Sequence, residues 1–288
     1  MPLLVDGEVE IDPAAIDVAC LSGDAWPGLI APFMRTTVAA PNLQWLHSFS
    51  AGVDHPVFAS FVRRGVALTN SPGASARPIA HSVIMLLLAL SRDLPGWVRA
   101  QDGRRWEQHF FDDIDGTTLG VVGMGTIGQE IGRAAQALGI EVIGCRRTPR
   151  PDDPWPTFAS VREVAPRVDW LVLAAPHTPQ TRHMIDASVL ASMRPTARLI
   201  NVGRGELVDD DALVHALRAG VIAGAALDVF ATEPLPPEHP LWSMPNVIVT
   251  PHSTGRSSGS DRRALAIFLD NLARFEAGKP LAHQVADL

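Results

Sequence analysis

The stretch from residue 117 to residue 147 constrains the fold of this chain of 288 residues more than any other. It begins with a short apolar run, Thr118 to Val122, whose β-branched residues predict a buried strand. Gly123, Gly125 and Gly128 follow at G-x-G-x-x-G spacing, and they lead into an amphipathic helical pattern and a second predicted strand. The order of strand, glycine loop, helix and strand predicts a dinucleotide-binding unit.

Each glycine of this loop has a physical task. The first allows a tight turn, the second lets a pyrophosphate approach the backbone, and the third lets the helix pack closely on the strand. The phosphates then face the free N–H groups and the positive end of the helix. The alternative interpretation is a glycine-rich turn in some other α/β protein, and the complete order of elements makes that alternative much weaker.

The end of the second strand predicts which dinucleotide binds. A unit that binds NAD usually has Asp or Glu there, to hold the ribose 2′-hydroxyl. This strand ends instead in Cys145, Arg146 and Arg147. Because guanidinium groups bind phosphate in a bidentate manner, the two arginines favour a 2′-phosphate and NADP(H) over NAD(H). Two alternatives stay open. The cofactor could be NAD(H), and the two arginines could contact only solvent.

Composition argues against several classes of partner. The formal net charge of −7 and the lack of a Lys/Arg run argue against nucleic acid. Two distant cysteines, Cys20 and Cys145, predict neither a metal site nor a disulfide framework and fit a reducing compartment. The longest strongly apolar run, 83–90, is too short to span a bilayer, and the N-terminal stretch lacks the basic region of a signal peptide. We therefore expect a cytoplasmic protein that binds no membrane.

The predicted elements indicate an α/β fold with two Rossmann-like domains, each built on a parallel sheet. The substrate domain takes residues 1–92 and 263–288, because the last helical pattern, 261–277, is expected to pack back on the N-terminal part. Residues 93–262 form the dinucleotide-binding domain, which is inserted between these two parts.

Two segments near the expected domain boundary predict contacts with other parts of the protein. The helical pattern 75–94 is apolar on every face from 83 to 90, which predicts burial on all sides. The polar stretch 93–115 is expected to be an irregular linker, or an arm against a partner subunit.

A loop in the N-terminal part is a candidate for binding an anion. Ala51, Gly52 and Val53 follow the predicted strand 43–49, and small residues in such a turn leave backbone N–H groups free to meet an anion. A simple loop without a ligand is the alternative, and this segment alone does not exclude it.

Three polar residues each follow a predicted strand of the nucleotide-binding domain: Arg204, Glu233 and His252. Ligands of an open parallel sheet bind outside the carboxyl ends of its strands, so the three side chains are expected to converge near the glycine loop. A histidine can give a proton to a carbonyl oxygen near neutral pH, a carboxylate can orient its ring, and an arginine can hold a substrate carboxylate. Each residue alone has a structural explanation, but the three together favour a catalytic site.

Six motifs, considered together, are specific: they are 50–54 (SAGVD), 123–128 (GMGTIG), 176–181 (PHTPQT), 201–205 (NVGRG), 226–230 (ALDVF) with Glu233-Pro234, and 250–252 (TPH). The chain with these motifs resembles the D-isomer-specific 2-hydroxyacid dehydrogenase family, and it is closest in type to its glyoxylate/hydroxypyruvate reductases. Arg146 stands where many NAD-dependent members have Asp, which resembles the members that use NADPH.

The resemblance implies a role for each matching residue. Arg204 would hold the 2-oxo acid, His252 would be the acid/base, Glu233 would orient His252, and the amides of Ala51 to Val53 would bind the substrate carboxylate. Asp228 would hold the nicotinamide carboxamide. The other family cofactor positions are Thr126, Ile127, Arg146, Pro176, Thr181 and Val202, and the expected cofactor site also includes Gly123, Gly125, Gly128, Arg147 and His252. The resemblance also implies a homodimer and no metal ion.

We therefore expect an oxidoreductase that transfers a hydride between NAD(P)H, with NADPH favoured, and a 2-oxo acid. One alternative is a nucleotide-sensing protein of the corepressor type, because a dinucleotide site does not require turnover. The other is a formate or phosphite dehydrogenase of the same fold.

Overall fold

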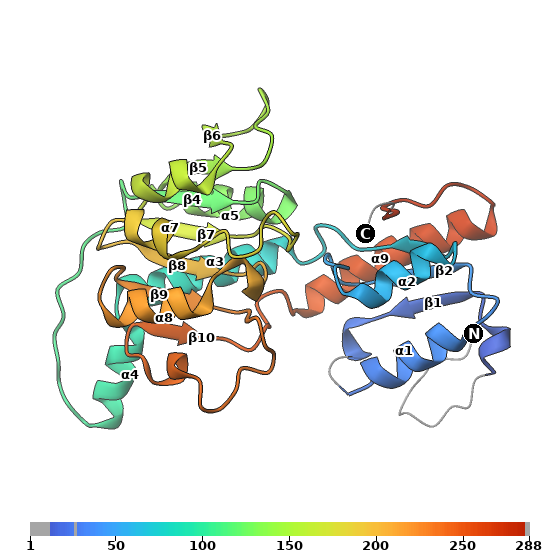
Figure 1. Ribbon diagram of the computed structural model, residues 1–288, viewed down its shortest axis with the longest axis horizontal. Coiled ribbons are helices and arrows are strands. Elements are labelled where there is room, and N and C mark those ends of the chain that lie inside the picture. Colours follow the sequence, from blue (N-terminus) through green and yellow to red (C-terminus); the bar gives the residue numbers. More distant parts are fainter. Residues whose placement is uncertain (1–11, 26–27, 286–288) are drawn as a thin grey trace. The chain divides into compact units, whose positions relative to one another are not determined.

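The computed structural model describes residues 12–25 and 28–285, so most of the N-terminal stretch behind the prediction about targeting lies outside the described residues. The chain divides into two compact units, Met1–Ser75 with Arg256–Leu288, and Ala76–Gly255. Each unit is built on its own parallel sheet, and the second unit is a continuous segment inserted into the first (Figure 1). The predicted α/β fold with two parallel sheets is confirmed.

The boundaries between the compact units lie after residues 75 and 255. The predicted domain boundaries were expected after residues 92 and 262. Helix α3 (Ala76–Ser91) belongs to the second unit because its apolar face packs in the same core as that unit's sheet. The division of the chain into functional domains stays a prediction, and the two compact units are used below.

The first unit has three parallel strands in the order β1-β2-β3, namely Val18–Leu21, Trp45–Ser48 and Ala67–Thr69. Its core is apolar and includes the fully buried Leu46 and Phe61. Trp45 stacks on Phe268 with 5.3 Å between ring centroids, which attaches the C-terminal helix to this sheet. The helices of this unit are α1 (Ile30–Ala39), α2 (Pro56–Arg63), α9 (Ser258–Glu276), and the 3₁₀ turns η1 (Pro13–Ala15) and η2 (Gly23–Ala25).

The second unit has seven strands in the order β10-β9-β8-β7-β4-β5-β6, and every neighbouring pair is parallel. The strands are β4 (Thr118–Val122), β5 (Glu141–Cys145), β6 (Thr157–Phe158), β7 (Trp170–Leu173), β8 (Arg198–Asn201), β9 (Gly224–Leu227) and β10 (Val247–Val249). The strand order reverses between β4 and β7, and an open sheet binds its ligand in the crevice at such a point. The glycine loop follows β4 directly.

Helices cover both faces of this sheet, because successive strand residues point to opposite sides. On one face, Trp170 and Val172 of β7 share a core with α3 and with α5 (Thr126–Gln136). On the other face, Leu171 and Leu173 pack with the helices of the later crossovers. These are α6 (Val161–Val164), α7 (Ala187–Ser192) and α8 (Asp210–Arg218), with the 3₁₀ turns η3 (Ala165–Arg167), η4 (Gly205–Leu207) and η5 (Pro240–Ser243) nearby in the chain.

Within one copy of the chain, helix α3 is buried on the face that meets the sheet, whereas Met85 and Leu88 remain 54% and 37% exposed on the other face, so its burial on all sides stays a prediction. A second prediction about this region is wrong in part. The stretch 93–115 is not wholly irregular, because it begins with helix α4 (Leu94–Asp102). The Asp93 side chain accepts a hydrogen bond from the Gly96 N–H and so caps this helix.

No single helix in the described ranges has the length and apolar composition needed to cross a membrane. Helices α3 and α4 have that length and composition only when they are taken as a pair, and they are bent by 64° relative to each other.

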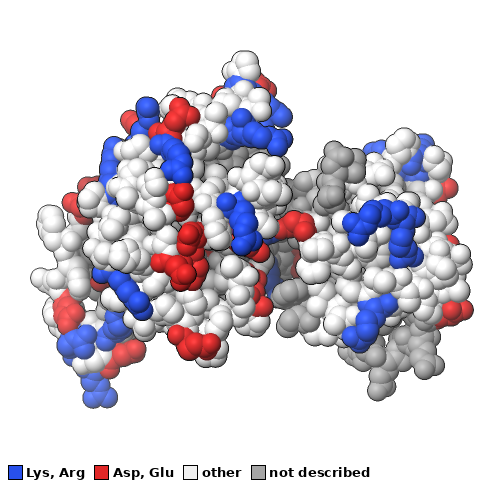
Figure 2. Space-filling view, in the orientation of Figure 1, with Lys and Arg blue, Asp and Glu red and all other residues white. Residues whose placement is uncertain are grey.

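In the face drawn in Figure 2, basic and acidic side chains are interspersed over both parts of the chain.

Candidate active site

The glycine loop after β4 has the geometry that a pyrophosphate requires. Gly123 has a φ of +103°, and a Cβ on it would lie 2.7 Å from the backbone of Ala174. A Cβ on Gly128 would collide with the carbonyl oxygen of Gly123, so this position must also lack a side chain. Gly125 precedes the first turn of α5, and nothing lies within 4 Å of the place where its Cβ would be. The residues present therefore fit a dinucleotide, with open space beside Gly125 and a helix N-terminus behind it.

The two arginines after β5 lie in different surroundings. The Arg146 guanidinium donates to the Asp153 carboxylate at 2.7 Å, and this carboxylate also accepts the Arg150 N–H at 2.7 Å. The hydrogen bond from the Arg150 N–H, together with Arg146, lowers the pKa of the Asp153 carboxyl although burial opposes the shift. Arg147 is exposed on the same turn. Asp153 thus holds Arg146 in place, and the proline-rich sequence around it gave no signal of that role.

The other predicted cofactor residues after β7 and β8 lie in ordered turns. The Thr181 hydroxyl donates to the Pro176 carbonyl at 2.8 Å, which closes the loop that follows β7. Val202 is buried directly after β8. Thr126 and Ile127 form the first turn of α5. All of these residues lie at the carboxyl ends of strands of one sheet, as the strand pattern predicted.

Arg204 lies on a turn that is held from both sides. The buried Asn201 accepts the Gly203 N–H at 3.1 Å and donates to the Arg204 carbonyl at 2.8 Å. The Arg204 guanidinium donates to the Gly203 carbonyl at 2.7 Å. A Cβ on Gly205 would collide with the backbone of Phe230, so this glycine lets the turns after β8 and β9 lie against each other. Asn201 occurs in the matched motif, but its role as a clamp could not be derived from the sequence.

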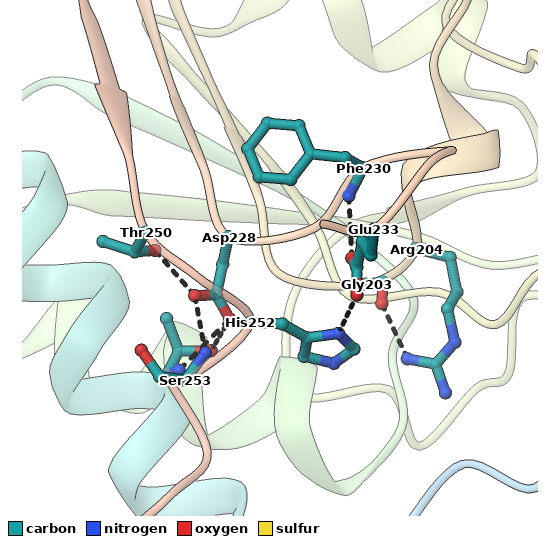
Figure 3. Close-up of polar contacts among 9 residues, drawn as sticks. Gly203, Arg204, Asp228, Phe230, Glu233, Thr250, His252 and Ser253 are labelled. Atoms are coloured by element: carbon teal, nitrogen blue, oxygen red, sulfur yellow. Dashed lines mark hydrogen bonds and ion pairs between the residues drawn. The ribbon is translucent and has the colours of Figure 1, made fainter. Parts of the chain in front are cut away.

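His252 and Glu233 are bonded to each other. Nδ1 of His252 lies 2.8 Å from Oε2 of Glu233, and Oε1 of Glu233 accepts the Phe230 N–H at 2.9 Å (Figure 3). Since Nδ1 is occupied, only Nε2 of the ring can exchange a proton with a ligand. Figure 3 shows the Arg204 side chain on the other side of the imidazole from Asp228, so the three predicted catalytic residues lie together.

The pair has shifted pKa values. The hydrogen bond to Glu233 raises the pKa of His252 above its ordinary value, although burial opposes the shift and the Arg204 charge lowers it. Burial alone would raise the pKa of the Glu233 carboxyl, but the hydrogen bonds from His252 and from the Phe230 N–H outweigh it and the net pKa is lowered. The arrangement therefore favours an imidazolium next to a carboxylate.

Asp228 is buried and holds the segment that carries His252. Its carboxylate accepts hydrogen bonds from the hydroxyls of Thr250 and Thr254, both at 2.6 Å, and from the N–H groups of Ser253 and Thr254. His252 itself has a φ of +48°, and its N–H donates to the Asp228 carbonyl at 2.8 Å. These contacts offset the cost of a left-handed conformation at a residue other than glycine. The contact of Asp228 with a carboxamide stays a prediction.

The candidate substrate loop belongs to the first unit and follows β2. The Asn70 side chain donates to the Ala51 carbonyl at 2.6 Å, and the Ser71 N–H donates to the Ser50 carbonyl at 3.3 Å. Val53 is buried in the core of this unit, whereas Gly52 is partly exposed. In the ranges that the structure describes, no group of three or more His, Cys, Asp or Glu could hold a metal ion.

Comparison with known proteins agrees with this geometry. Residues 84–254 match the family described as D-isomer specific 2-hydroxyacid dehydrogenase, NAD binding domain. The chain belongs to the D-isomer specific 2-hydroxyacid dehydrogenase family. It is therefore an NAD(P)-dependent dehydrogenase, and the predicted class of enzyme is confirmed. Among curated relatives, glyoxylate/hydroxypyruvate reductase A of Arabidopsis thaliana is 36% identical over 245 residues, which are 84% of this chain and 78% of that protein.

Solved structures of the family have the same fold. One is a D-isomer specific 2-hydroxyacid dehydrogenase from Xanthobacter autotrophicus Py2 in complex with NADPH and MES, with a TM-score of 0.79 at 33% identity over 98% of this chain and 88% of that one. Another is an NADPH-dependent glyoxylate/hydroxypyruvate reductase from Sinorhizobium meliloti in complex with NADP and sulfate. Its TM-score is 0.79 at 33% identity, over 94% of this chain and 85% of that one.

Proposed function

We propose that this dehydrogenase is an NADPH-preferring reductase of small 2-oxo acids of the glyoxylate and hydroxypyruvate type. The observation that carries the proposal is the 2.8 Å contact between His252 and Glu233, with Arg204 beside it at the edge of the sheet that bears the glycine loop. The names of the relatives support the substrate class, since several are glyoxylate reductases.

In this proposal the groups of the site have separate roles in binding and in proton transfer. The Arg204 guanidinium pairs with the substrate carboxylate and polarises the neighbouring carbonyl, and the amides of Ala51 to Val53 bind the same carboxylate. The bound dinucleotide supplies a hydride to the carbonyl carbon. His252 gives its Nε2 proton to the carbonyl oxygen, and Glu233 stabilises the imidazolium before the transfer. In the direction of oxidation, His252 takes the proton back.

The preference for NADPH is supported by Arg146. Its guanidinium is held by Asp153 at the end of β5, where an NAD-binding unit has an acid for the ribose 2′-hydroxyl. Two solved relatives are complexes with NADPH or NADP, which supports the same choice. Arg147 is exposed beside Arg146 and would contribute a second positive charge.

Replacing Arg146 with alanine is expected to raise KM for NADPH by about tenfold to a hundredfold, because one charge-assisted contact with a phosphate is lost. KM for NADH should change far less, since NADH has no 2′-phosphate. Initial rates with both cofactors measure the difference. Arg218→Ala, at an exposed position on α8, is the matched control. Equal changes for the two cofactors would show that Arg146 does not contact the 2′-phosphate.

Replacing Glu233 with glutamine is expected to lower the pKa of His252, because the hydrogen bond to the carboxylate is the main cause that raises it. Reduction needs protonated His252, so kcat/KM falls as pH rises through this pKa. The alkaline limb of the profile should therefore move to lower pH in Glu233→Gln. Glu238→Gln, at an exposed position in the same loop, serves as the control. An alkaline limb at the wild-type position would contradict the role given to Glu233.

We further propose that two copies of the chain associate. Large apolar side chains are exposed along α3, α4 and the segment that follows: Met85, Trp97, Trp106 and Phe110 are 54%, 38%, 93% and 101% exposed. Side chains of this size and exposure are typical of a surface that another chain covers.

The cytoplasmic location expected from the sequence stays a prediction.

A substrate screen tests the function directly. Glyoxylate, hydroxypyruvate and larger 2-oxo acids are each assayed with NADPH and with NADH, and oxidation of the cofactor is followed. Turnover of a small 2-oxo acid, with a higher kcat/KM for NADPH, is expected. If the wild-type protein turns over no 2-oxo acid with either cofactor, the proposed function fails.

A further inference from the structure

A buried polar network lies in the first unit, beneath the candidate substrate loop. His47, in β2, is completely buried and is paired in the sheet register with Cys20 on one side and Thr69 on the other. Its Nδ1 lies 2.7 Å from the Thr69 hydroxyl, and its Nε2 lies 3.1 Å from the Ser71 hydroxyl. The proposed reaction does not use this histidine.

The hydrogen-bond pattern assigns one tautomer to the ring. Trp45 Nε1 can only donate, and it donates to the Thr69 oxygen at 2.8 Å. At the other end, the Ser71 hydroxyl donates to the Ser48 carbonyl at 3.2 Å, and that carbonyl can only accept. The Ser71 end fixes the direction of the chain of bonds: its hydroxyl has given its only proton to Ser48, so Nε2 of His47 carries a proton and donates to Ser71. In the neutral ring Nδ1 is then an acceptor, and the Thr69 hydroxyl donates to it while accepting from Trp45.

The network ends on the backbone that leads into the candidate substrate loop. Ser48 is the last residue of β2, and its carbonyl is the final acceptor of the chain of bonds. The residues of the 70–71 turn also hold the next carbonyls, because Ser71 N–H donates to Ser50 and the Asn70 side chain donates to Ala51. The path of the loop at residues 48–51 thus depends on the position of Ser71, and His47 fixes the Ser71 hydroxyl.

We infer that His47 is a positioning residue, which acts through Ser71 to hold the 48–53 loop in the conformation that presents its amides to the substrate carboxylate. This inference rests on the proposed function, in which Ala51 to Val53 bind that carboxylate. It assigns an effect on substrate affinity to a residue whose side chain is completely buried.

Two further observations fit this role. Burial, with a smaller effect of the His283 charge, lowers the pKa of His47 to about 4, so the ring stays neutral and keeps the assigned tautomer near neutral pH. The ring also lies against aromatic side chains, with Phe49 at 5.9 Å and Phe268 at 5.5 Å between centroids. Burying a polar side chain among apolar ones costs free energy that an apolar side chain would not cost. A histidine at this place is therefore consistent with hydrogen bonds that serve the loop.

The test compares His47→Phe, His47→Gln and Ser71→Ala with the wild-type enzyme. Phenylalanine keeps a ring but removes both hydrogen bonds, alanine removes only the hydroxyl that joins His47 to Ser48, and glutamine can restore part of the bonding. We expect KM for glyoxylate to rise about tenfold in Ser71→Ala, the effect of one lost buried hydrogen bond, at least as much in His47→Phe, and less in His47→Gln. KM for NADPH and kcat at saturating glyoxylate should stay near the wild-type values.

Thr37→Val is the matched control, because Thr37 has a buried hydroxyl in the same unit that donates within α1, to the Phe33 carbonyl. It should lower the melting temperature without changing KM. If His47→Phe does not fold, Ser71→Ala decides the question. A wild-type KM for glyoxylate in the folded variants, with only a lower melting temperature, overturns the inference while the proposed function stands. A wild-type enzyme that reduces no 2-oxo acid overturns both.

Discussion

Replacing His252 with asparagine is expected to lower kcat for 2-oxo acid reduction by about 10²-fold to 10⁴-fold, the range for loss of a general acid. The 2.8 Å contact with Glu233 holds the ring and keeps its pKa raised, so the wild-type side chain is ready to give a proton near neutral pH. Asparagine can fill part of the same space but has no proton to transfer in this range.

Stopped-flow and steady-state assays with saturating NADPH measure this loss, and fluorescence titration measures NADPH affinity, which should change far less. His215→Asn is the matched control, because His215 is exposed on α8 away from the strand ends. A His252→Asn enzyme that kept kcat within about tenfold of the wild-type value would not be using this imidazole as its acid.

Replacing Arg204 with alanine is expected to lower kcat/KM for the 2-oxo acid by about 10²-fold to 10³-fold, as is typical when one donor to a developing oxyanion is removed. The backbone at Arg204 is held by the Asn201 turn and by the close approach of Gly205 to Phe230, and the guanidinium donates to the Gly203 carbonyl. Lysine keeps the charge but not the planar fork, and Arg204→Lys should therefore fall between wild type and alanine.

Variation of the 2-oxo acid at saturating NADPH separates KM from kcat for these variants. Arg194→Ala is the control, since Arg194 pairs with Asp169 just before β7, at the opposite end of the strands. The Arg204 charge lowers the pKa of His252, so its loss should also move the alkaline limb to higher pH. An unchanged kcat/KM in Arg204→Ala would remove this residue from the substrate site.

Local signals in the sequence predicted the elements around the cofactor. Strand β4 has the predicted bounds, because an apolar run ends at a glycine that needs a positive φ. Helix α8 begins after Asp209, a residue type that favours a helix start, and this side chain accepts the Ala212 N–H. Period, caps and glycines act over a few residues, so a single sequence is enough to find them.

Features that depend on distant parts of the chain were not predictable. Asp153 holds Arg146 across a proline-rich loop with no regular pattern, and Asp228 meets Thr254 only after two neighbouring strands have paired. Helix α4 was missed because Gly96 has low helix propensity and lies in its first turn, although Asp93 caps the helix and Pro95 is tolerated at its position. The strand pattern and the resemblance to a family predicted that Arg204, Glu233 and His252 would lie together, but not the contacts by which Asn201 and Asp153 hold the neighbouring turns.

Because the first unit takes residues from both ends of the chain, the ribosome finishes it last. The second unit has all its residues once position 255 has been synthesised, whereas the sheet of the first unit still lacks α9, whose Phe268 and Phe275 pack on Trp45. Trp45 is thus synthesised long before the helix that covers it, and all of the second unit is made in between. Domains usually fold as units in the order in which they are completed, so we expect the second unit to fold before the first.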